Sequence, residues 1–339
     1  PDWGAVPRSN RSAQTSRAGG AYTSRMNGAA RRAWTLVLAG GLVLALSGCG
    51  PVADRRAEPE SSVSFTLDGL ERSYAVHLPP DHRADVPTAV LLALHGRGGS
   101  ASQFEGSSGL DEVADQRGFV VVYGQGTTWG RLNAPVWNAG DCCGQAVDAE
   151  QAVDDVGYAR EVLRRVGADF AVDPDRVFVT GMSNGAMMAE RLACEAADLF
   201  RGAASVSGVL QIARCEPSRP ISVLLMHGTD DPSVPYQGGT GTGLSRVEAI
   251  PTEQNLADWA ARNGCAGPPE AEPVPTQPDE NGRTVDLLRY SGCRAEVALY
   301  RINGGVHEWP GGRIDGPLNN DEPTTAIHAA DVVADFFGL

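Results

Sequence analysis

Lysine is absent from this sequence. Its 28 basic residues are all arginine, and 42 acidic residues give a formal net charge of −14 at pH 7. Nucleic-acid-binding proteins neutralise phosphates with a basic surface, so this shortage of positive charge argues against nucleic acid as a partner. No C-x-x-C pair occurs among the cysteines, and nothing else suggests a zinc site or another metal site.

A long apolar run is also lacking. The stretch over residues 33–46 is shorter than the roughly 20 residues that a membrane-spanning helix needs. It follows Arg31-Arg32 and ends in small residues, which is the order of an export signal that starts at Met26. Residues 1–48 are therefore predicted to be upstream sequence and signal peptide, and the polar residues 49–61 are predicted to be a tether.

The end of this signal, Leu46-Ser-Gly-Cys49, resembles the bacterial lipobox, in which the cysteine is acylated. The alternative is an ordinary signal peptide with an incidental cysteine. Anionic lipid heads would repel so acidic a chain, so a lipid anchor on Cys49 is the membrane contact that we expect. The sequence thus predicts a protein that is exported and is either lipid-anchored on the outer face of the cell membrane or secreted.

Six cysteines remain when Cys49 is set aside, and an even number in an exported chain favours disulfides. The expected pairs, in order of preference, are Cys265 with Cys293, Cys194 with Cys215, and the vicinal Cys142 with Cys143. The last two pairs could also be crossed, because spacing alone does not fix their connectivity.

Length and composition fit one large α/β domain or two ordinary ones, since 42% of the 339 residues are hydrophobic and 21% are charged. Runs that are short and apolar or β-branched predict strands over 62–67, 72–78, 88–94, 119–123, 177–180, 203–208, 221–226, 285–290 and 297–302. Amphipathic runs predict helices over 110–117, 153–166, 186–194, 253–263 and 324–337. Residues 266–280, rich in proline and glutamate, are expected to form a surface insertion.

One turn carries the strongest chemical signal. Gly181-Met-Ser-Asn-Gly185 separates a predicted strand from a predicted helix. G-x-S-x-G in that context is typical of a nucleophile elbow, in which the serine lies at the apex of a sharp turn. Ser183 is therefore the expected nucleophile, although the same letters also occur in ordinary Gly/Ser turns.

A glycine-rich loop, His95-Gly-Arg-Gly-Gly-Ser100, follows the buried strand 88–94. It lacks the spacings that bind nucleotide phosphates. In α/β-hydrolases such a loop supplies half of the oxyanion hole, and the residue after the nucleophile supplies the other half. The expected donors are the backbone N–H groups of Arg97 and Asn184.

A serine hydroxyl needs a base, and the base needs a carboxylate that orients it. In α/β-hydrolases these groups follow in the chain order serine, acid, histidine. Asp230-Asp231 comes after a later strand, and His307 lies in a glycine-rich loop after the last strand. His307 is the expected base, because His328 is predicted to lie within a helix. His95 and His227 precede glycines at strand ends and are expected to hold their loops.

Taken together, these motifs resemble the polyhydroxybutyrate depolymerase-type esterases, which include feruloyl and acetylxylan esterases. The resemblance extends from about residue 60 to the end. It is carried by 94–99, 137–144, 153–157, 181–186, 227–232 and 305–311. It implies the α/β-hydrolase fold, with a mostly parallel central sheet and helices on both faces, over a single catalytic domain at 62–339. It also implies that Asp231, the fifth residue of H-G-x-x-D, is the acid and that Asp230 is a solvated neighbour.

The implied activity is hydrolysis of carboxylic esters by a serine esterase without a cofactor. Trp137 and Trp309 are candidates either for the substrate pocket or for the core. Arg97 stands where many family members carry cysteine, and its charge at the pocket rim would favour carboxylated substrates. No long apolar insertion is present to form a lipase lid. The alternatives are a serine peptidase of the same fold and a catalytically inactive lipoprotein that binds a polymer.

Overall fold

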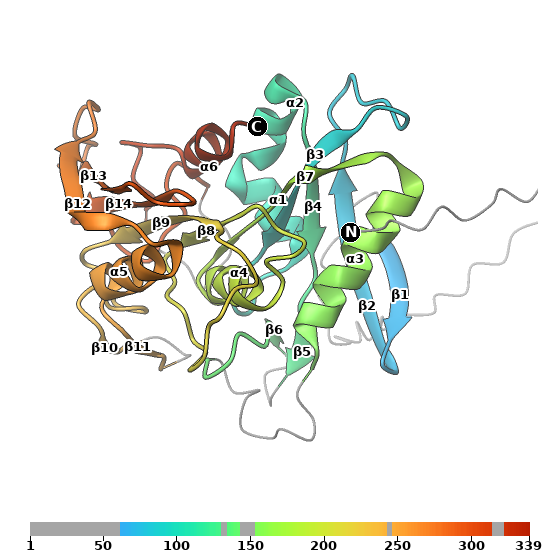
Figure 1. The fold of residues 1–339 in the computed structure, drawn as a ribbon, viewed down its shortest axis with the longest axis horizontal. Helices are drawn as coiled ribbons and strands as arrows, with labels where there is room; N and C mark the ends of the chain where they lie inside the picture. Colours follow the sequence, from blue (N-terminus) through green and yellow to red (C-terminus); the bar gives the residue numbers. More distant parts are fainter. Residues whose placement is uncertain (1–61, 130–133, 143–152, 243–245, 314–321) are drawn as a thin grey trace, which may run out of the picture. The chain divides into compact units, whose positions relative to one another are not determined.

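The computed structural model describes residues 62–129, 134–142, 153–242, 246–313 and 322–339. A ten-stranded sheet runs through this part of the chain in the order β1-β2-β4-β3-β7-β8-β9-β14-β13-β12 (Figure 1). The predicted signal peptide, the tether, Cys49 and Cys143 lie outside the described residues.

The six central strands are parallel to one another, whereas the strands at both edges pair antiparallel. The central strands are β4 (Val120–Gly124), β3 (Thr88–Leu94), β7 (Val172–Met182), β8 (Gly202–Val206), β9 (Ser222–Gly228) and β14 (Val297–Asn303). The outer strands are β1 (Val63–Leu67), β2 (Leu70–His77), β13 (Thr284–Ser291) and β12 (Ala266–Pro273). Two small hairpins lie outside this sheet, β5 (Thr127–Trp129) with β6 (Ala134–Val136) and β10 (Gly239–Thr240) with β11 (Glu248–Ala249).

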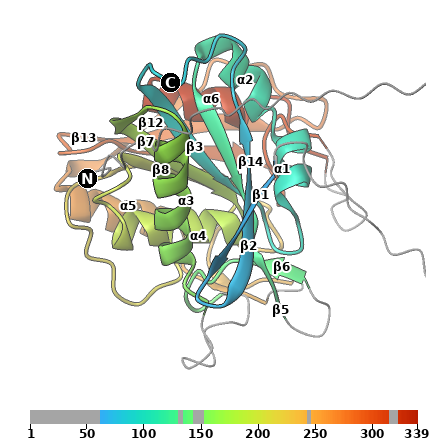
Figure 2. The same ribbon diagram turned by 90° about the vertical axis from the view of Figure 1, so that its right-hand side faces the viewer.

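Helices cover both faces of the sheet, as the turned view in Figure 2 also shows. One face packs against α3 (Asp155–Asp169), α4 (Asn184–Glu195) and α5 (Thr252–Asn263). The other packs against α1 (Ala101–Ser108), α2 (Leu110–Arg117) and α6 (Ala329–Phe337). This arrangement confirms the predicted fold class.

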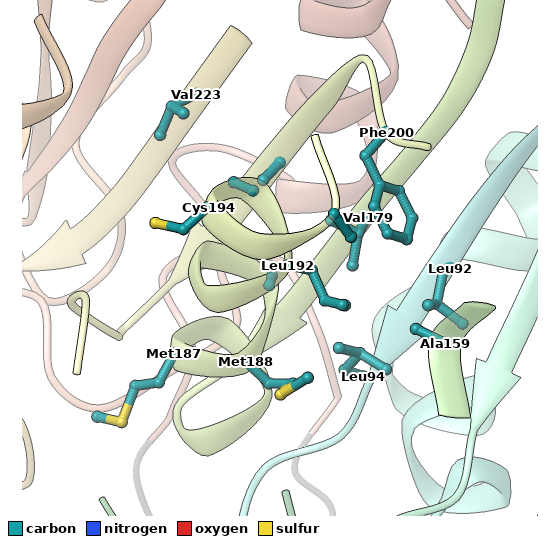
Figure 3. Close-up of a cluster of buried hydrophobic side chains, with 14 of the residues drawn as sticks. Leu92, Leu94, Ala159, Val179, Met187, Met188, Leu192, Cys194, Phe200 and Val223 are labelled. Carbon is teal, nitrogen blue, oxygen red and sulfur yellow. The ribbon is translucent and has the colours of Figure 1, made fainter. Parts of the chain in front are cut away.

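The central strands are apolar throughout because both of their faces are buried. In β3, Val90, Leu92 and Leu94 belong to the core under α3 and α4, whereas Leu91 belongs to the core on the opposite face. This alternation follows from the two-residue period of a strand. Figure 3 shows the first core, where side chains of α4, including Met188 and Leu192, meet Leu92, Leu94 and Val179 of the sheet.

The predicted hairpin is confirmed. Asp68 and Gly69 both have positive φ, at 50° and 79°, and they join β1 to β2. Two consecutive positive φ values are those of a type I′ turn, whose twist suits a two-residue hairpin.

Two elements were not predicted, and one predicted helix begins later than expected. Part of the predicted insertion, Ala266–Pro273, is the edge strand β12. Its prolines obscured the strand, yet an edge strand tolerates proline because one side of its backbone needs no partner. The last helix begins at Ala329, so His328 is its N-cap rather than a residue of its interior. Helix α1 was not predicted, because its eight residues are mostly small and polar.

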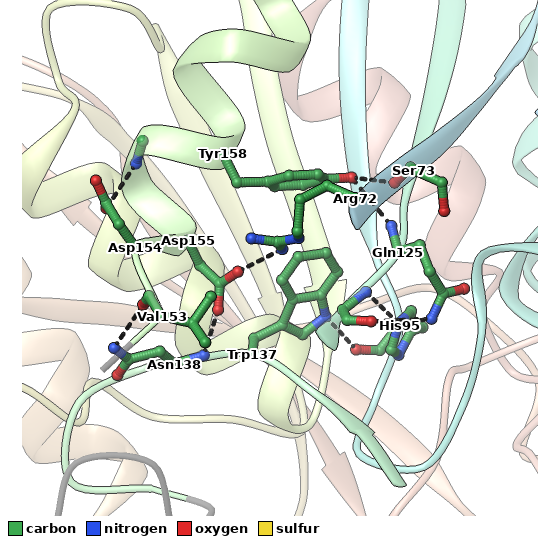
Figure 4. A network of polar contacts seen from close by, with 12 residues as sticks. Arg72, Ser73, His95, Gln125, Trp137, Asn138, Val153, Asp154, Asp155 and Tyr158 are labelled. Carbon is green, nitrogen blue, oxygen red and sulfur yellow. Dashed lines mark hydrogen bonds and ion pairs between the residues drawn. The ribbon is translucent and has the colours of Figure 1, made fainter. Parts of the chain in front are cut away.

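A buried network fixes the segment that begins at Trp137 (Figure 4). The Asp155 carboxylate accepts from the Arg72 guanidinium at 2.6 Å and from the Asn138 N–H at 2.6 Å. Asp154 is the N-cap of α3 and accepts from the Gly157 N–H at 2.7 Å. Both carboxylates of this acidic pair are therefore engaged in local structure.

Two of the predicted disulfides are confirmed, Cys194–Cys215 and Cys265–Cys293. Cys142 is also disulfide-bonded. The first bridge ties the end of α4 to the segment before β9, and the second ties the end of α5 to the turn between β13 and β14.

Removing the second bridge is expected to cost stability. Cys265 and Cys293 are separated by 28 residues. Loop-closure entropy for that length corresponds to about 3–4 kcal/mol. The double variant Cys265→Ser/Cys293→Ser should therefore unfold at a clearly lower urea concentration, and its ester hydrolysis before unfolding should be unchanged. An unchanged midpoint would contradict this expectation.

Candidate active site

Ser183 lies at the point where β7 turns into α4. Its φ and ψ are 55° and −118°, a conformation that non-glycine residues adopt only under strain. Two backbone hydrogen bonds hold it there: the Ser183 N–H donates to Val206 O at 2.8 Å, and its carbonyl accepts from the Met187 N–H at 3.0 Å. The turn has the strand–serine–helix context that the sequence predicted.

The two glycines of the motif are required by close packing. A Cβ on Gly181 would lie 2.4 Å from the backbone of Gly185, and one on Gly185 would lie 2.1 Å from Leu94 O. Real Cβ atoms do not approach backbone atoms so closely. The elbow is thus compressed between its own helix and the end of β3.

Gly185→Ala is therefore expected to prevent folding or to lower the melting temperature severely. The neighbouring Ala186→Gly variant is the control, because it removes a methyl group instead of adding one and should cost about 1 kcal/mol for a helical position, plus the lost packing. Thermal unfolding followed by circular dichroism measures both. A Gly185→Ala protein as stable as the wild type would contradict the packing described above.

The predicted acid, Asp231, follows β9 and is buried, with 4% of its surface exposed. One oxygen accepts from the Ser233 and Val234 N–H groups, each at 2.8 Å. The other accepts from His307 Nδ1 at 2.8 Å and lies 3.4 Å from His227 Nε2. Its neighbour Asp230 is exposed, as the sequence predicted.

These donors decide the charge of the carboxyl group. Burial alone would raise the pKa of Asp231, but hydrogen bonds from His227 and His307, and the charges of these histidines, outweigh it. The pKa of Asp231 therefore lies well below its usual range, and the side chain is a carboxylate at neutral pH. A carboxylate at this place accepts the Nδ1 proton of His307, so in the neutral form of the ring Nε2 is the nitrogen without a proton.

His227 contributes more than the loop support expected of it. Its ring is buried, and Nε2 donates to Val234 O at 2.8 Å while also facing the Asp231 carboxylate. Nδ1 lies 3.3 Å from the Thr252 hydroxyl. The four-residue spacing in H-G-x-x-D is the sequence signal for this contact, which faces the same Asp231 oxygen as His307 does.

The loop that carries His307 is joined to the turn that carries Asp231. The Thr229 and Asp230 N–H groups donate to Ile302 O and Gly305 O, each at 2.9 Å, and Gly304 N–H donates to the Thr229 hydroxyl at 2.8 Å. A Cβ on Gly228 would lie 2.2 Å from Gly305 O, so glycine is needed for this approach. The ends of β9 and β14, which are adjacent and parallel, thus bring Asp231 and His307 together.

The segment after β8 lies between the serine and the histidine. Val206 O accepts the Ser183 N–H, and the Ser207 hydroxyl donates to the carbonyl of Glu308 at 3.0 Å. The three predicted residues therefore follow β7, β9 and β14, and the end of β8 links the first of them to the His307 loop. No hydrogen bond joins the Ser183 hydroxyl to His307 within the described residues. Hydrogen bonds of this kind often tighten only when substrate binds.

The predicted oxyanion loop also borders the serine. A Cβ on Gly96 would lie 3.5 Å from the Ser183 Cβ, so the loop contacts the elbow directly. Asn184 is the first residue of α4, where the helix provides no carbonyl partner for the N–H. The Asn184 side chain is engaged elsewhere: its oxygen accepts from the Trp137 N–H at 2.7 Å, and its amide donates to the Trp137 carbonyl at 3.0 Å.

His95 has the structural role expected of it. Nδ1 donates to Gly96 O at 2.7 Å, and Nε2 accepts from the Gly126 N–H at 3.0 Å. Both ring nitrogens are therefore committed to backbone, and the ring fixes the shape of the loop on which Arg97 is carried.

Both tryptophans fit the core alternative rather than the pocket alternative. Trp137 has no exposed surface, and its indole N–H donates to His95 O at 2.9 Å. Trp309 is buried against Phe104, and its indole N–H donates to Ser108 O at 2.9 Å. Each side chain instead anchors a loop beside the site, the first through the Trp137 segment and the second through the His307 loop.

A buried carboxylate on α4, the helix that follows Ser183, was not predicted. Glu190 of α4 accepts from the Ser205 hydroxyl, the Asn255 amide and the Trp259 indole, all within 2.9 Å. Burial raises the pKa of Glu190 although all three donors oppose it. Its position inside a helical run gave no sign of this role, because a single glutamate there is typical of a solvated face.

Among the described residues, no group of three or more His, Cys, Asp or Glu side chains could hold a metal ion. Within the same residues, no helix is long and apolar enough to cross a membrane.

A mostly parallel sheet covered by helices, with a strained serine between strand and helix, defines an α/β-hydrolase. The acetyl xylan esterase from Aspergillus awamori has a similar fold, with a TM-score of 0.57 and 17% sequence identity over 82% of this chain and 99% of that one. A family model described as esterase PHB depolymerase matches residues 72–232.

Two relatives extend this match. The protein named "Putative esterase NocK" from Nocardia uniformis subsp. tsuyamanensis is 33% identical over 304 residues, which are 84% of this chain and 84% of the relative. Feruloyl esterase B from Piromyces equi is 29% identical over 245 residues, which are 70% of this chain and 42% of that protein. The chain belongs to the esterase PHB depolymerase family, and it is a carboxylic-ester hydrolase.

Proposed function

We propose that Ser183, His307 and Asp231 form the catalytic triad of this esterase. The observation that carries the proposal is the 2.8 Å hydrogen bond from His307 Nδ1 to the buried Asp231, at the ends of β9 and β14, which only β8 separates from the strand that leads to the strained Ser183. Ser183 attacks the ester carbonyl while His307 Nε2 takes its proton. Asp231 holds the ring in the required tautomer and stabilises the imidazolium.

The developing oxyanion is bound by the backbone N–H groups of Arg97 and Asn184. The contact of the Gly96 loop with Ser183 and the position of Asn184 at the start of α4 support this assignment. One such donor is worth about 10²–10³ in rate. His307 then protonates the leaving alcohol, and a water molecule repeats the sequence to release the acid.

We propose that the substrates are soluble or short-chain esters, including the acyl esters of plant cell walls. Feruloyl esterase names recur among the relatives, and an acetylxylan esterase from Coprinopsis cinerea is 38% identical over 120 residues. Hydrolysis rates on methyl ferulate, an aryl acetate and hydroxybutyrate oligomers test this proposal. Preference for the oligomers, or cleavage of peptides in place of esters, would contradict it.

We further propose that the protein is exported and anchored through an acylated Cys49. The disulfides agree with an oxidising compartment outside the cytoplasm. Metabolic labelling with an alkyne fatty acid should tag the wild type and leave the Cys49→Ser variant untagged. An untagged wild type would favour secretion without an anchor.

An inactive binding lipoprotein, the remaining alternative, would hydrolyse none of the three esters.

A further inference from the structure

Ser207 immediately follows β8, the strand between the one that leads to Ser183 and the one that leads to Asp231. It is fully buried, and its backbone N–H donates to Met226 O at 2.9 Å. Its hydroxyl donates to the Glu308 carbonyl at 3.0 Å. Glu308 is the residue after His307, so this hydroxyl holds the loop of the proposed base.

The other side of the same segment touches the nucleophile. Val206 O accepts the Ser183 N–H at 2.8 Å. A Cβ on Gly208 would lie 2.6 Å from the Ala186 Cβ and 3.0 Å from Ser183 O. Residues 206–208 therefore contact the elbow directly, and the Ser207 hydroxyl is at the same time hydrogen-bonded to the His307 loop.

The backbone of Ser207 is strained. Its φ is 54°, one of four positive values among the described non-glycine residues, and Ser183 is another. Glycine would adopt this conformation without strain but has no hydroxyl, and serine is the smallest residue that supplies one. Strain of this kind persists where the surrounding structure or the function requires it.

We propose that Ser207 is a positioning residue that sets the place of His307 relative to Ser183. The proposal rests on the catalytic roles proposed above. Ser207 does not touch the reacting atoms; it acts through the backbone of Glu308. The distance between nucleophile and base is critical, because a misplacement of about 1 Å can cost about 10²-fold in rate.

The test compares two variants that both remove the hydroxyl. Ser207→Ala keeps the strained backbone with a Cβ, and Ser207→Gly relieves it. For hydrolysis of p-nitrophenyl acetate, each should lower kcat by about 10- to 100-fold and leave KM close to the wild-type value. The rate of labelling by a fluorophosphonate should fall by a similar factor. If Ser207→Ala does not fold, Ser207→Gly carries the test.

Thr180→Val is the matched control. The Thr180 hydroxyl is also fully buried and donates to a backbone carbonyl, that of Ala204 at 3.1 Å, but this bond joins β7 to β8 and does not reach the His307 loop. This variant should lower the melting temperature and leave kcat unchanged.

The outcomes separate the two proposals. A wild type that reacts at Ser183, together with Ser207 variants that keep its kcat and labelling rate, would overturn the positioning role and leave the triad standing. Equal losses of kcat in Thr180→Val would also overturn it, because the effect would then follow from stability. A folded wild type that neither labels nor hydrolyses esters would instead overturn the triad.

Discussion

Ser183→Ala is expected to lower kcat/KM for ester hydrolysis by about 10⁴- to 10⁶-fold, the range found when a triad member is removed from another serine hydrolase. Alanine keeps the Cβ and the strained backbone of the elbow, and it removes the one atom that attacks the carbonyl. The Ser183 hydroxyl makes no hydrogen bond to His307 in the structure, so its loss should cost little stability.

The measurement is steady-state hydrolysis of p-nitrophenyl acetate, with thermal unfolding recorded on the same samples. A Ser183→Ala protein with unchanged melting temperature and activity near the spontaneous rate is the expected result. Activity within a factor of about ten of the wild type would mean that another group is the nucleophile, since the oxyanion hole and binding alone retain far less than that.

Asp231→Asn is expected to lower kcat by about 10³- to 10⁴-fold, an effect of tautomer rather than of charge alone. The second oxygen of Asp231 faces two ring nitrogens, His307 Nδ1 and His227 Nε2. An amide N–H₂ placed there would turn His307 to the tautomer with a proton on Nε2, which cannot accept the proton of Ser183. In the opposite orientation, the amide N–H₂ would face the Ser233 and Val234 N–H groups, which are also donors and could not bond to it.

The neighbouring Asp230→Asn variant is the matched control. It makes the same chemical change one residue away, on an exposed side chain whose contact in the structure is the Thr229 hydroxyl. Its activity should equal that of the wild type at neutral pH and at every lower pH at which the wild type stays folded. If Asp230→Asn lost as much activity as Asp231→Asn, the assignment of the acid would be wrong.

Much of the fold was predictable because its signals are local. Buried strands are apolar at nearly every position, as in β3. Asp-Gly between two strand-like runs favours a two-residue hairpin turn, as at Asp68-Gly69. The elbow could also be predicted from its glycines, Gly181 and Gly185, since each permits a close backbone approach that a residue with a Cβ does not allow. Cysteine spacing suggested both confirmed bridges, but it left open whether Cys194 and Cys215 pair with each other or with the vicinal cysteines.

The contacts that align the proposed triad could not be predicted, because they join residues far apart in the chain. The bond from Ser207 to Glu308 spans 101 positions, and that from Trp309 to Ser108 spans 201. The local sequence around Ser207 or Trp309 does not indicate which backbone carbonyl will accept the hydrogen bond of the side chain. The same limit applies to Trp137, whose partners are the loop of His95 and the side chain of Asn184.

The central claim, that Ser183 is activated by His307 and Asp231, is tested most directly by a fluorophosphonate probe followed by peptide mass mapping. One adduct is expected, on the peptide that contains Ser183, with labelling abolished in Ser183→Ala and in His307→Ala. A folded wild type that stays unlabelled, or an adduct on a different serine, would contradict it.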